Sequence, residues 1–284
     1  MFQAVDTKDA AAVEREVNAA YLAAFSDGDP QFMNRCFHWT ADCFAGRYRD
    51  FQPIDARYHD FEHTMQGTLC MGRLLHRYQR AQARPALDRR RFELGIVAIL
   101  FHDTGYLKKQ GDNHGTGAKY TFTHVARSTE FAALLLSEKG FPLRDIRAVQ
   151  SMIRCTGLNV NLDEIPFDDE LDRVVGYALS TADLLGQMAA ADYVEKLPIL
   201  YGEFAEALAT HPELAPDNSQ FASAEDLMRR TPHFWRDYVV PRLNREFRGL
   251  FHYLDDPFPG GPNDYVQRVE ASLARLAQQL QHAT

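Results

Sequence analysis

Cysteine is scarce in this sequence, which contains Cys36, Cys43, Cys70 and Cys155 and no Cys-x-x-Cys pair. Four cysteines with this spacing do not form the dense framework of a disulfide-stabilised secreted protein. The simplest interpretation is that all four are reduced thiols, as is usual in the cytosol.

Long apolar runs are missing as well. No stretch approaches the ~20 consecutive apolar residues that a membrane-spanning helix needs. The first residues, MFQAVDTKDAAAVEREV, acquire acidic charge early and lack the apolar stretch of a signal peptide. We therefore expect a cytoplasmic protein that has no membrane partner.

Positive charge is not in excess either, because the sequence contains 31 Lys and Arg against 39 Asp and Glu. The formal net charge is −8. A protein that coats nucleic acid needs clustered Lys and Arg against the phosphates, so this balance argues against that class. A small phosphorylated substrate remains compatible with the charge, because metal ions and a few local cations can supply the positive field.

What the chain does contain is helical periodicity along nearly all of its 284 residues, with an ordinary globular composition of 45% hydrophobic and 25% charged residues. We predict an all-α fold with its core over residues 55–190. Residues 1–54 are expected to form a helical extension packed on the core, and residues 191–284 a helical region that completes the same compact unit.

Two helices are central to this prediction. One spans 59–81, and the other spans 88–103, is apolar almost all round and should be buried, with Gly105 ending it. Residues 106–122 have little periodicity and predict a long mobile loop, a common arrangement for a substrate lid. Further helices are predicted over 6–23, 30–38, 123–140, 142–155, 168–188, 193–211, 224–254 and 264–282.

The first group of residues that could carry chemistry is Tyr58-His59-Asp60-Phe61-Glu62-His63. His59 and His63 are four residues apart, so both imidazoles are expected to project from one face of a helix. Spacing of this kind also suits a structural or exposed histidine pair, so its meaning depends on what accompanies it.

Two further groups accompany the histidines. His102-Asp103 follows the apolar run IVAILF, where an ionisable pair is costly to bury unless a metal or other partners satisfy it. Asp183 lies among leucines and valines, where a lone charge would be unstable. Taken alone, these residues could be a capping aspartate, a satisfied core histidine and a salt-bridged carboxylate. Taken with His63, they complete a shell of two imidazoles and two carboxylates.

The order His63, His102-Asp103, Asp183 on a helical background resembles the HD superfamily of metal-dependent phosphohydrolases over roughly residues 55–190. The string Tyr-His-x-x-x-His is similar to the version in cyclic-nucleotide phosphodiesterases and in a group of small bacterial HD proteins. The resemblance implies an HD-domain helical bundle, here with additional N- and C-terminal helices. It also implies a metal held by these four residues, and His59 as the general acid or a phosphate contact.

An imidazole and carboxylate shell suits Mn, Fe, Zn, Ni or Mg and leaves positions for water. A bound metal lowers the pKa of that water, and a proton donor such as His59 is then needed at the leaving oxygen. We expect one divalent ion, whose identity the sequence does not fix, and allow for a second ion. Asp103, a ligand and part of the catalytic machinery, could bridge the two.

His124 is a candidate for a second metal or for substrate, with a helix cap or a supporting histidine as the alternative. Many HD proteins have His-Glu-x-x-Ser here, and Val125 replaces the Glu. Thr156 lies where related proteins often have another histidine, so a binuclear site built from several histidines is not expected.

Four cations, Lys108, Lys109, Lys119 and Arg127, could hold the phosphate of a substrate. For the lysines, a solvated loop is the competing interpretation. His114, in the same loop, is expected to be a solvated histidine.

We therefore expect hydrolysis of a phosphomonoester or phosphodiester bond in a small nucleotide-like substrate. A rival within enzymes is an oxygenase-like use of iron, which normally demands a richer set of histidines. A rival outside enzymes is a sensing or scaffold protein that binds metal without turnover. Residues 264–282 could cover the core or a partner subunit, which leaves a homo-oligomer open.

Overall fold

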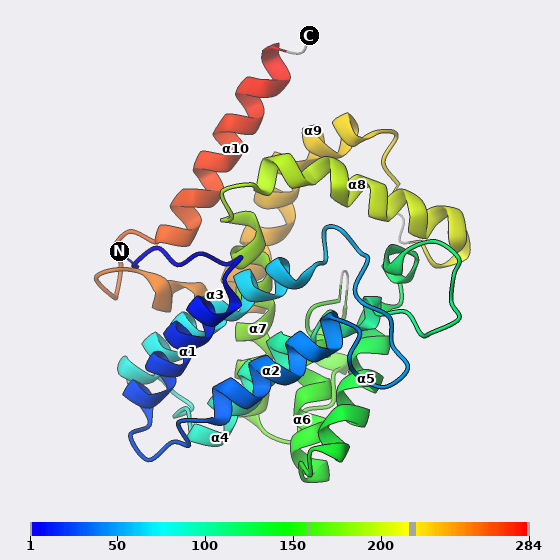
Figure 1. The fold of residues 1–284 in the computed structure, drawn as a ribbon. Helices are drawn as coiled ribbons and strands as arrows, with labels where there is room; N and C mark the ends of the chain where they lie inside the picture. Colours follow the sequence, from blue (N-terminus) through cyan, green and yellow to red (C-terminus); the bar gives the residue numbers. More distant parts are fainter. Residues whose placement is uncertain (1, 158–159, 216–219, 283–284) are drawn as a thin grey trace.

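The computed structural model describes residues 2–157, 160–215 and 220–282, and the regular structure in these ranges is helical (Figure 1). The α-helices are α1 (Ala10–Ala24), α2 (Phe32–Phe44), α3 (Phe61–Arg80), α4 (Arg89–Phe101), α5 (His124–Glu138), α6 (Leu143–Arg154), α7 (Glu170–Met188), α8 (Tyr193–Thr210), α9 (Ala224–Phe234) and α10 (Asp264–His282). Shorter helical turns are η1 (Thr104–Tyr106), η2 (Gly117–Tyr120), η3 (Leu162–Glu164), η4 (Pro212–Leu214), η5 (Trp235–Val239), η6 (Arg242–Glu246) and η7 (Leu250–Leu254). The all-α prediction is confirmed.

Aspartates set the beginnings of the helices that build the site. The carboxylate of Asp60 accepts a hydrogen bond from the third residue of α3, and Asp88 and Asp169 do the same for α4 and α7. Such caps satisfy backbone N–H groups that have no partner inside the helix. The α3 helix therefore begins at Phe61, two residues later than predicted.

The α4 helix is the centre of the core. Every residue from Phe92 to Phe101 is buried, which confirms the prediction of a central helix. The helix ends at Phe101, and His102-Asp103 leads into η1. Gly105 lies inside η1, so the prediction that it ends the helix is wrong. A Cβ at this position would lie 2.0 Å from the backbone oxygen of His124, so the glycine allows η1 to touch α5.

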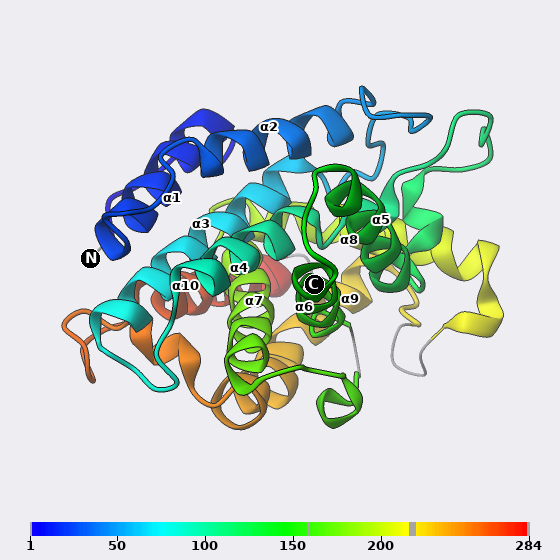
Figure 2. The same ribbon diagram turned by 90° about the horizontal axis from the view of Figure 1, so that it is seen from below.

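The helices form layers around α3 and α4. Figure 2 shows α1 and α2 on one side of this pair and α7 on the other. The contacts agree, since α1 packs on α3, α2 on α4, and α7 on both α3 and α4. Helices α5 and α6 pack on each other and extend the core beside α4.

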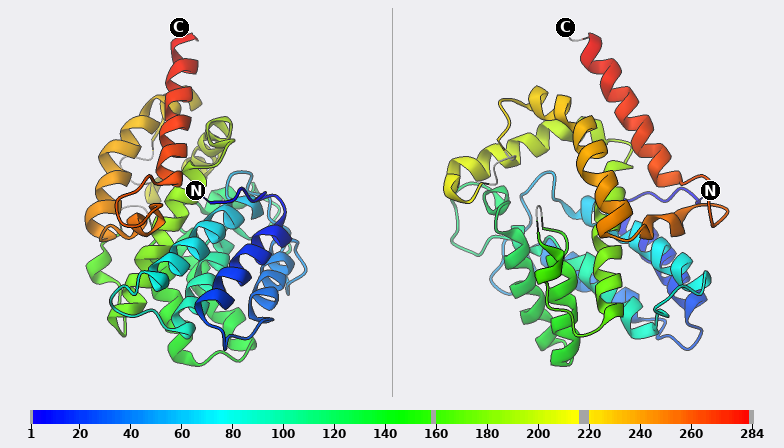
Figure 3. Two further views of the ribbon diagram at one scale, coloured as in Figure 1. Left: turned by 90° about the vertical axis from the view of Figure 1, so that its left-hand side faces the viewer. Right: turned by 180° about the vertical axis from the view of Figure 1, so that it is seen from behind.

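The C-terminal helices contact the core directly. Helix α8 packs on η2, and α10 packs on α7 and α8. Val269 and Leu276 of α10 are fully buried, while Figure 3 shows the end of the helix reaching beyond its neighbours. The division into three regions stays a prediction, and residues 158–159, 216–219 and 283–284 lie outside the described residues. Within the described ranges, no helix combines the length and apolarity needed to cross a bilayer.

Residues 106–122 are more ordered than the predicted mobile loop. They contain η2, and the Lys108 side chain is buried, with Nζ 2.7 Å from Asp55 Oδ2 and 2.8 Å from the Gly115 oxygen. Thr116 donates from its hydroxyl to Glu206 of α8 at 2.7 Å. This segment is therefore attached to the core at one point and to α8 at another.

The contact between α3 and α7 is unusually close. A Cβ added to Gly186 would lie 2.7 Å from the Gln66 oxygen and 2.9 Å from the Gly67 Cα, both of them backbone atoms. Gly67 in turn faces Ile99 and the Cα of Asp183. Because glycines meet at this crossing, the side chains one turn away on the two helices are brought together.

We expect Gly186→Ala to lower the free energy of unfolding by about 1–3 kcal/mol, because the added methyl group meets backbone that cannot move aside. Gly202→Ala is the matched control, since that Cβ would have no atom within 4 Å. The control should gain about 0.5–1 kcal/mol from helix propensity. Urea unfolding measures both changes, and equal stability of the two variants would contradict the role of the α3–α7 contact.

Candidate metal centre

His63 and Asp183 meet at the contact between α3 and α7. His63 is in the first turn of α3, held by the bond from its backbone N–H to Asp60 at 2.8 Å. Its Nε2 lies 3.2 Å from Asp183 Oδ1. Gln187, one turn further along α7, donates to Asp183 Oδ1 at 3.3 Å and helps to orient the carboxylate. The two helices thus place one imidazole and one carboxylate together.

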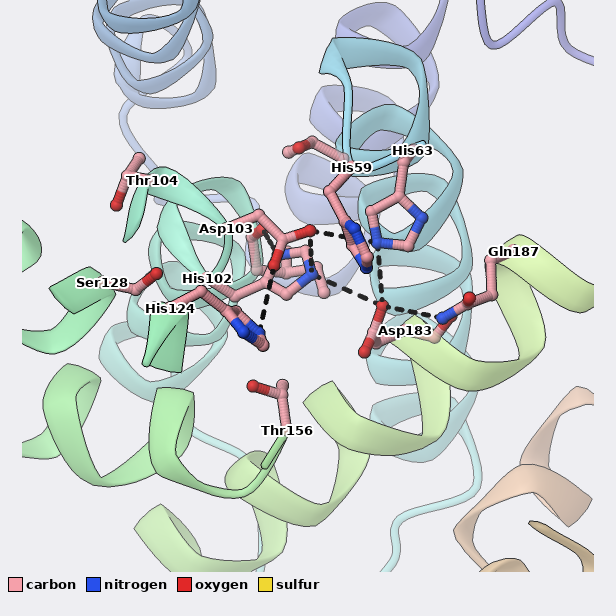
Figure 4. A network of polar contacts seen from close by, with 12 residues as sticks. His59, His63, His102, Asp103, Thr104, His124, Ser128, Thr156, Asp183 and Gln187 are labelled. Atoms are coloured by element: carbon pink, nitrogen blue, oxygen red, sulfur yellow. Dashed lines mark hydrogen bonds and ion pairs between the residues drawn. The ribbon is translucent and has the colours of Figure 1, made fainter. Parts of the chain in front are cut away.

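His102 and Asp103 approach the same point from the end of α4. His102 Nδ1 is 2.7 Å from the Ile99 oxygen, so Nδ1 carries the proton and Nε2 keeps its lone pair. That Nε2 lies 3.2 Å from Asp103 Oδ2 and 3.4 Å from Asp183 Oδ1. Asp103 Oδ2 is also 3.1 Å from His63 Nε2. Figure 4 shows these side chains converging.

This geometry fits a metal ion. His102 Nε2 and Asp103 Oδ2 are buried and form no hydrogen bond with any described residue, although they lie 3.2 Å apart. Two ligand atoms ~2.1 Å from one ion, at roughly 90–110° to each other, are ~3.0–3.4 Å apart. The imidazole-to-carboxylate distances of 3.1 to 3.4 Å match that spacing. The buried His63-His102-Asp103 group could therefore hold a metal ion.

The charges of the cluster are strongly coupled. Burial lowers the pKa of His63, but its contacts with Asp103 and Asp183 outweigh burial and raise the pKa to about 10. Burial raises the pKa of Asp103 and of Asp183, and here the histidines outweigh it and hold both values below the usual range. The carboxylates are thus anionic, and a cation arriving at the cluster would displace protons from the imidazoles.

One side of the cluster is accessible. The side chains of His63, His102 and Asp103 are at most 3% exposed. Those of His59, His124 and Asp183 are 14 to 16% exposed. Solvent therefore reaches the cluster on the side that these three residues border.

His59 lies outside α3, so the expectation that His59 and His63 share a helical face is wrong. It precedes the capping Asp60, yet its ring centroid is only 5.3 Å from that of His63. His59 Nδ1 lies 2.6 Å from Oε2 of Glu203, whose Oε1 accepts the Tyr58 backbone N–H at 2.7 Å. Hydrogen bonds to Glu203, rather than helical spacing, hold His59 beside the cluster.

Glu203 is a functional candidate that the sequence did not reveal. It is buried in α8, 144 residues along the chain from His59. Burial raises the pKa of Glu203, but the interactions with His59 outweigh burial and lower it. An anionic Glu203 accepts the proton of His59 Nδ1, which leaves Nε2 for the accessible side. Because the two residues are so far apart in the chain, no local sequence pattern connects Glu203 with His59.

His124 begins α5 and faces the other oxygen of Asp103. Its Nε2 lies 3.7 Å from Asp103 Oδ1, and its Nδ1 is 2.7 Å from the Thr121 oxygen. Burial lowers the pKa of His124, so the ring is neutral near pH 7. Figure 4 also shows Thr156, at the end of α6, on the side between His124 and Asp183.

The four predicted phosphate-binding cations have other partners, and Lys119 Nζ lies 2.5 Å from Asp112 Oδ1. Lys108 is buried against Asp55, and Lys109 is exposed, with its Nζ 3.5 Å from Asp50. Arg127 donates to the backbone oxygens of Gly105 and Leu107 at 2.7 and 2.9 Å. These side chains therefore interact with residues of the protein itself, chiefly backbone oxygens of residues 105–115 and nearby aspartates. His114 is exposed, as expected.

The fold and the His63-His102-Asp103 group define an all-helical protein with a buried site that could hold a metal ion. The chain belongs to the Npun_R2479-like family, whose sequence model matches residues 110–255. The matched range includes Asp183 and begins after His102-Asp103. No curated protein matches the chain. The matching family is not the HD superfamily, so the HD resemblance stays a prediction that the buried group supports only weakly.

Metal analysis tests the site directly. Protein purified without chelator should contain about one transition metal per chain, and His102→Ala should lose it, because one imidazole ligand is removed. His38→Ala is the control, since the side chain of His38 is 71% exposed and paired with Asp42. Unchanged metal content in folded His102→Ala protein, judged by circular dichroism, would rule out this site.

The stability of the metal-free protein should fall as the pH rises, because the pKa of His63 is raised from 6.5 to about 10. The proton on His63 stabilises the folded state fully below pH 6.5, and this contribution is lost as the pH rises toward 10. A bound ion replaces the proton, so metal-loaded protein should not share the loss. Thermal unfolding across this range, with and without chelator, measures the difference, and parallel curves would contradict it.

Proposed function

We propose that this protein is a metal-dependent phosphohydrolase that cleaves a phosphomonoester or phosphodiester bond in a small nucleotide-like substrate. The observation that carries the proposal is a set of two buried imidazoles, the buried carboxylate of Asp103 and the partly exposed carboxylate of Asp183, with a His59–Glu203 pair beside it. Ligand atoms alone would suit many metal proteins. A proton donor next to them, on the accessible side, is what hydrolysis of a phosphate ester adds.

In this proposal His63, His102, Asp103 and Asp183 hold one divalent ion. The lone pair of His102 Nε2 is directed there by the bond of Nδ1 to the Ile99 oxygen. A divalent ion held by these side chains would lower the pKa of a coordinated water and polarise a phosphoryl oxygen. The two anionic carboxylates keep the net charge of the loaded centre low.

His59 is the proposed general acid. Its Nε2 would donate a proton to the oxygen of the leaving group as the bond to phosphorus breaks. Glu203 accepts the hydrogen bond of Nδ1, which keeps the ring oriented. Glu203 is therefore a positioning residue.

A scissile phosphate would enter on the side bordered by His59, His124 and Asp183. His124, whose Nε2 faces Asp103 Oδ1, is the residue best placed to contact substrate or a second ion. Lys108 and Arg127 are left out of the proposal, because their polar groups are used inside the protein.

The rival proposal is a sensing or scaffold protein that binds metal without turnover. Such a protein needs the ligands and has no use for a proton donor. Burying the carboxylate of Glu203 is costly unless hydrogen-bond donors satisfy it, and it accepts hydrogen bonds from His59 and from the backbone N–H of Tyr58 beside it. The presence of Thr156 in place of a histidine also argues against an oxygenase-like use of iron.

Turnover on simple esters tests the proposal. Protein loaded with Mn or Mg is assayed on nitrophenyl phosphate, bis-nitrophenyl phosphate, mononucleotides and cyclic nucleotides. We expect His59→Ala to lower kcat by about 10²–10⁴-fold because the acid is lost, and Glu203→Gln by about 10–100-fold because the ring is less well held. Both variants should keep their metal.

His252→Ala is the control, because that side chain is 54% exposed and paired with Asp255. It should match the wild-type rate. Stoichiometric metal without turnover on any of these esters would favour the sensing protein. Turnover that His59→Ala leaves unchanged would remove His59 from the mechanism.

A further inference from the structure

Tyr106 contacts two imidazoles of the site and has no role in the mechanism proposed so far. It ends η1, three residues after Asp103, and its side chain is fully buried. Its ring stacks on His59, with centroids 4.5 Å apart and planes at 12°, and on His124, with centroids 4.7 Å apart and planes at 20°. One aromatic ring thus supports both histidines on the accessible side of the cluster.

Each of these histidines is held at a single nitrogen by a hydrogen bond. His59 Nδ1 is bonded to Glu203, and His124 Nδ1 is bonded to the Thr121 oxygen. A bond at one nitrogen fixes a point on the ring but leaves the ring free to tilt about it. A flat surface packed in parallel restricts that freedom, and stacked aromatic rings attract each other beyond the effect of the area that they bury. Tyr106 supplies such a surface for both rings.

The backbone on either side of Tyr106 is firmly held, so its ring is a fixed support. The Gly105 N–H donates to the hydroxyl oxygen of Ser128 at 2.8 Å, and Arg127 donates to the oxygens of Gly105 and Leu107. The backbone oxygen of Tyr106 faces Gly117, and a Cβ added to Gly117 would lie only 2.2 Å from that oxygen.

The hydroxyl of Tyr106 contributes less than the ring. It is buried and forms no hydrogen bond with any residue that the structure describes. Thr121, which lies near it, donates its own hydroxyl to the Ala118 oxygen at 2.7 Å. A buried hydroxyl without a partner does not stabilise the fold, and its removal is neutral or favourable.

We propose that Tyr106 is a positioning residue, whose ring fixes the planes of His59 and His124 so that both Nε2 atoms face the metal cluster. Its effect on turnover rests on the proposed function, whereas its effect on the imidazoles does not. Because the aromatic ring makes these contacts, phenylalanine should substitute for Tyr106, whereas an aliphatic side chain should not.

The test compares Tyr106→Phe with Tyr106→Leu and Tyr106→Met, two variants of different shape that both lack a ring. Nitrogen NMR of the histidine rings in zinc-loaded protein reports on His59 and His124 without any substrate. We expect single sharp ring signals in wild type and Tyr106→Phe, and broadened or multiple signals for both histidines in the aliphatic variants. The control is Tyr78→Leu, which removes a buried tyrosine from another element, α3. It should leave both signals unchanged.

Kinetics with an active ester substrate give the second measurement. The aliphatic variants should lose about 10–100-fold in kcat with little change in KM, because misplaced groups slow the chemical step more than they weaken binding. Tyr106→Phe should retain wild-type kcat within about threefold.

Unchanged histidine signals in the aliphatic variants would overturn the proposal, whatever the kinetics show. If both aliphatic variants are unfolded and Tyr106→Phe is folded, Tyr106 is a core residue and the proposal is also overturned. Absence of turnover in wild-type protein would sink the phosphohydrolase proposal alone, since the NMR comparison still decides the role of Tyr106.

Discussion

Two carboxylates, one of them fully buried, face two buried imidazoles, and this is the constraint on which the structure depends. Asp103 and Asp183 carry like charges into a site that is largely closed to water, and such charges are tolerated only with a cation or protons beside them. When no metal is bound, a proton on His63 balances this charge, because its contacts with Asp103 and Asp183 raise the pKa of His63 to about 10. The glycine-lined contact of α3 and α7, together with the end of α4, then has a clear physical purpose: it holds opposite charges at 3.1 to 3.4 Å.

The site also includes residues from elements other than those that carry its four metal-binding candidates. Helix α8 provides Glu203, which holds His59, and η1 provides Tyr106, which stacks on His59 and His124. The proposed proton donor is therefore supported from two directions, by a charge at one ring nitrogen and by an aromatic surface along the ring. The C-terminal helices are in this sense part of the site, although only their packing was expected.

The sequence predicted the four candidate ligands because each stands out locally. His102-Asp103 interrupts an apolar run, Asp183 lies within another, and His63 belongs to a paired motif. It did not predict how His59 is held, because capping by Asp60 competes with the helical pattern and moves the start of α3 past His59. Glu203 had no signal at all, since a partner 144 residues away leaves no spacing to read. The charges of Lys108 and Arg127 suggested that they bind phosphate, but in the structure they bind backbone oxygens of residues 105–115, and Lys108 also pairs with Asp55.

Glu203 and Glu206 are three residues apart on α8, so they lie on neighbouring positions of one helical face. The first holds His59, and the second holds Thr116 in the segment that follows η1. A rigid helix transmits a displacement to all of its side chains together. A tilt of α8 would therefore loosen the proposed proton donor and the segment around Thr116 in the same motion, so this helix couples the two mechanically.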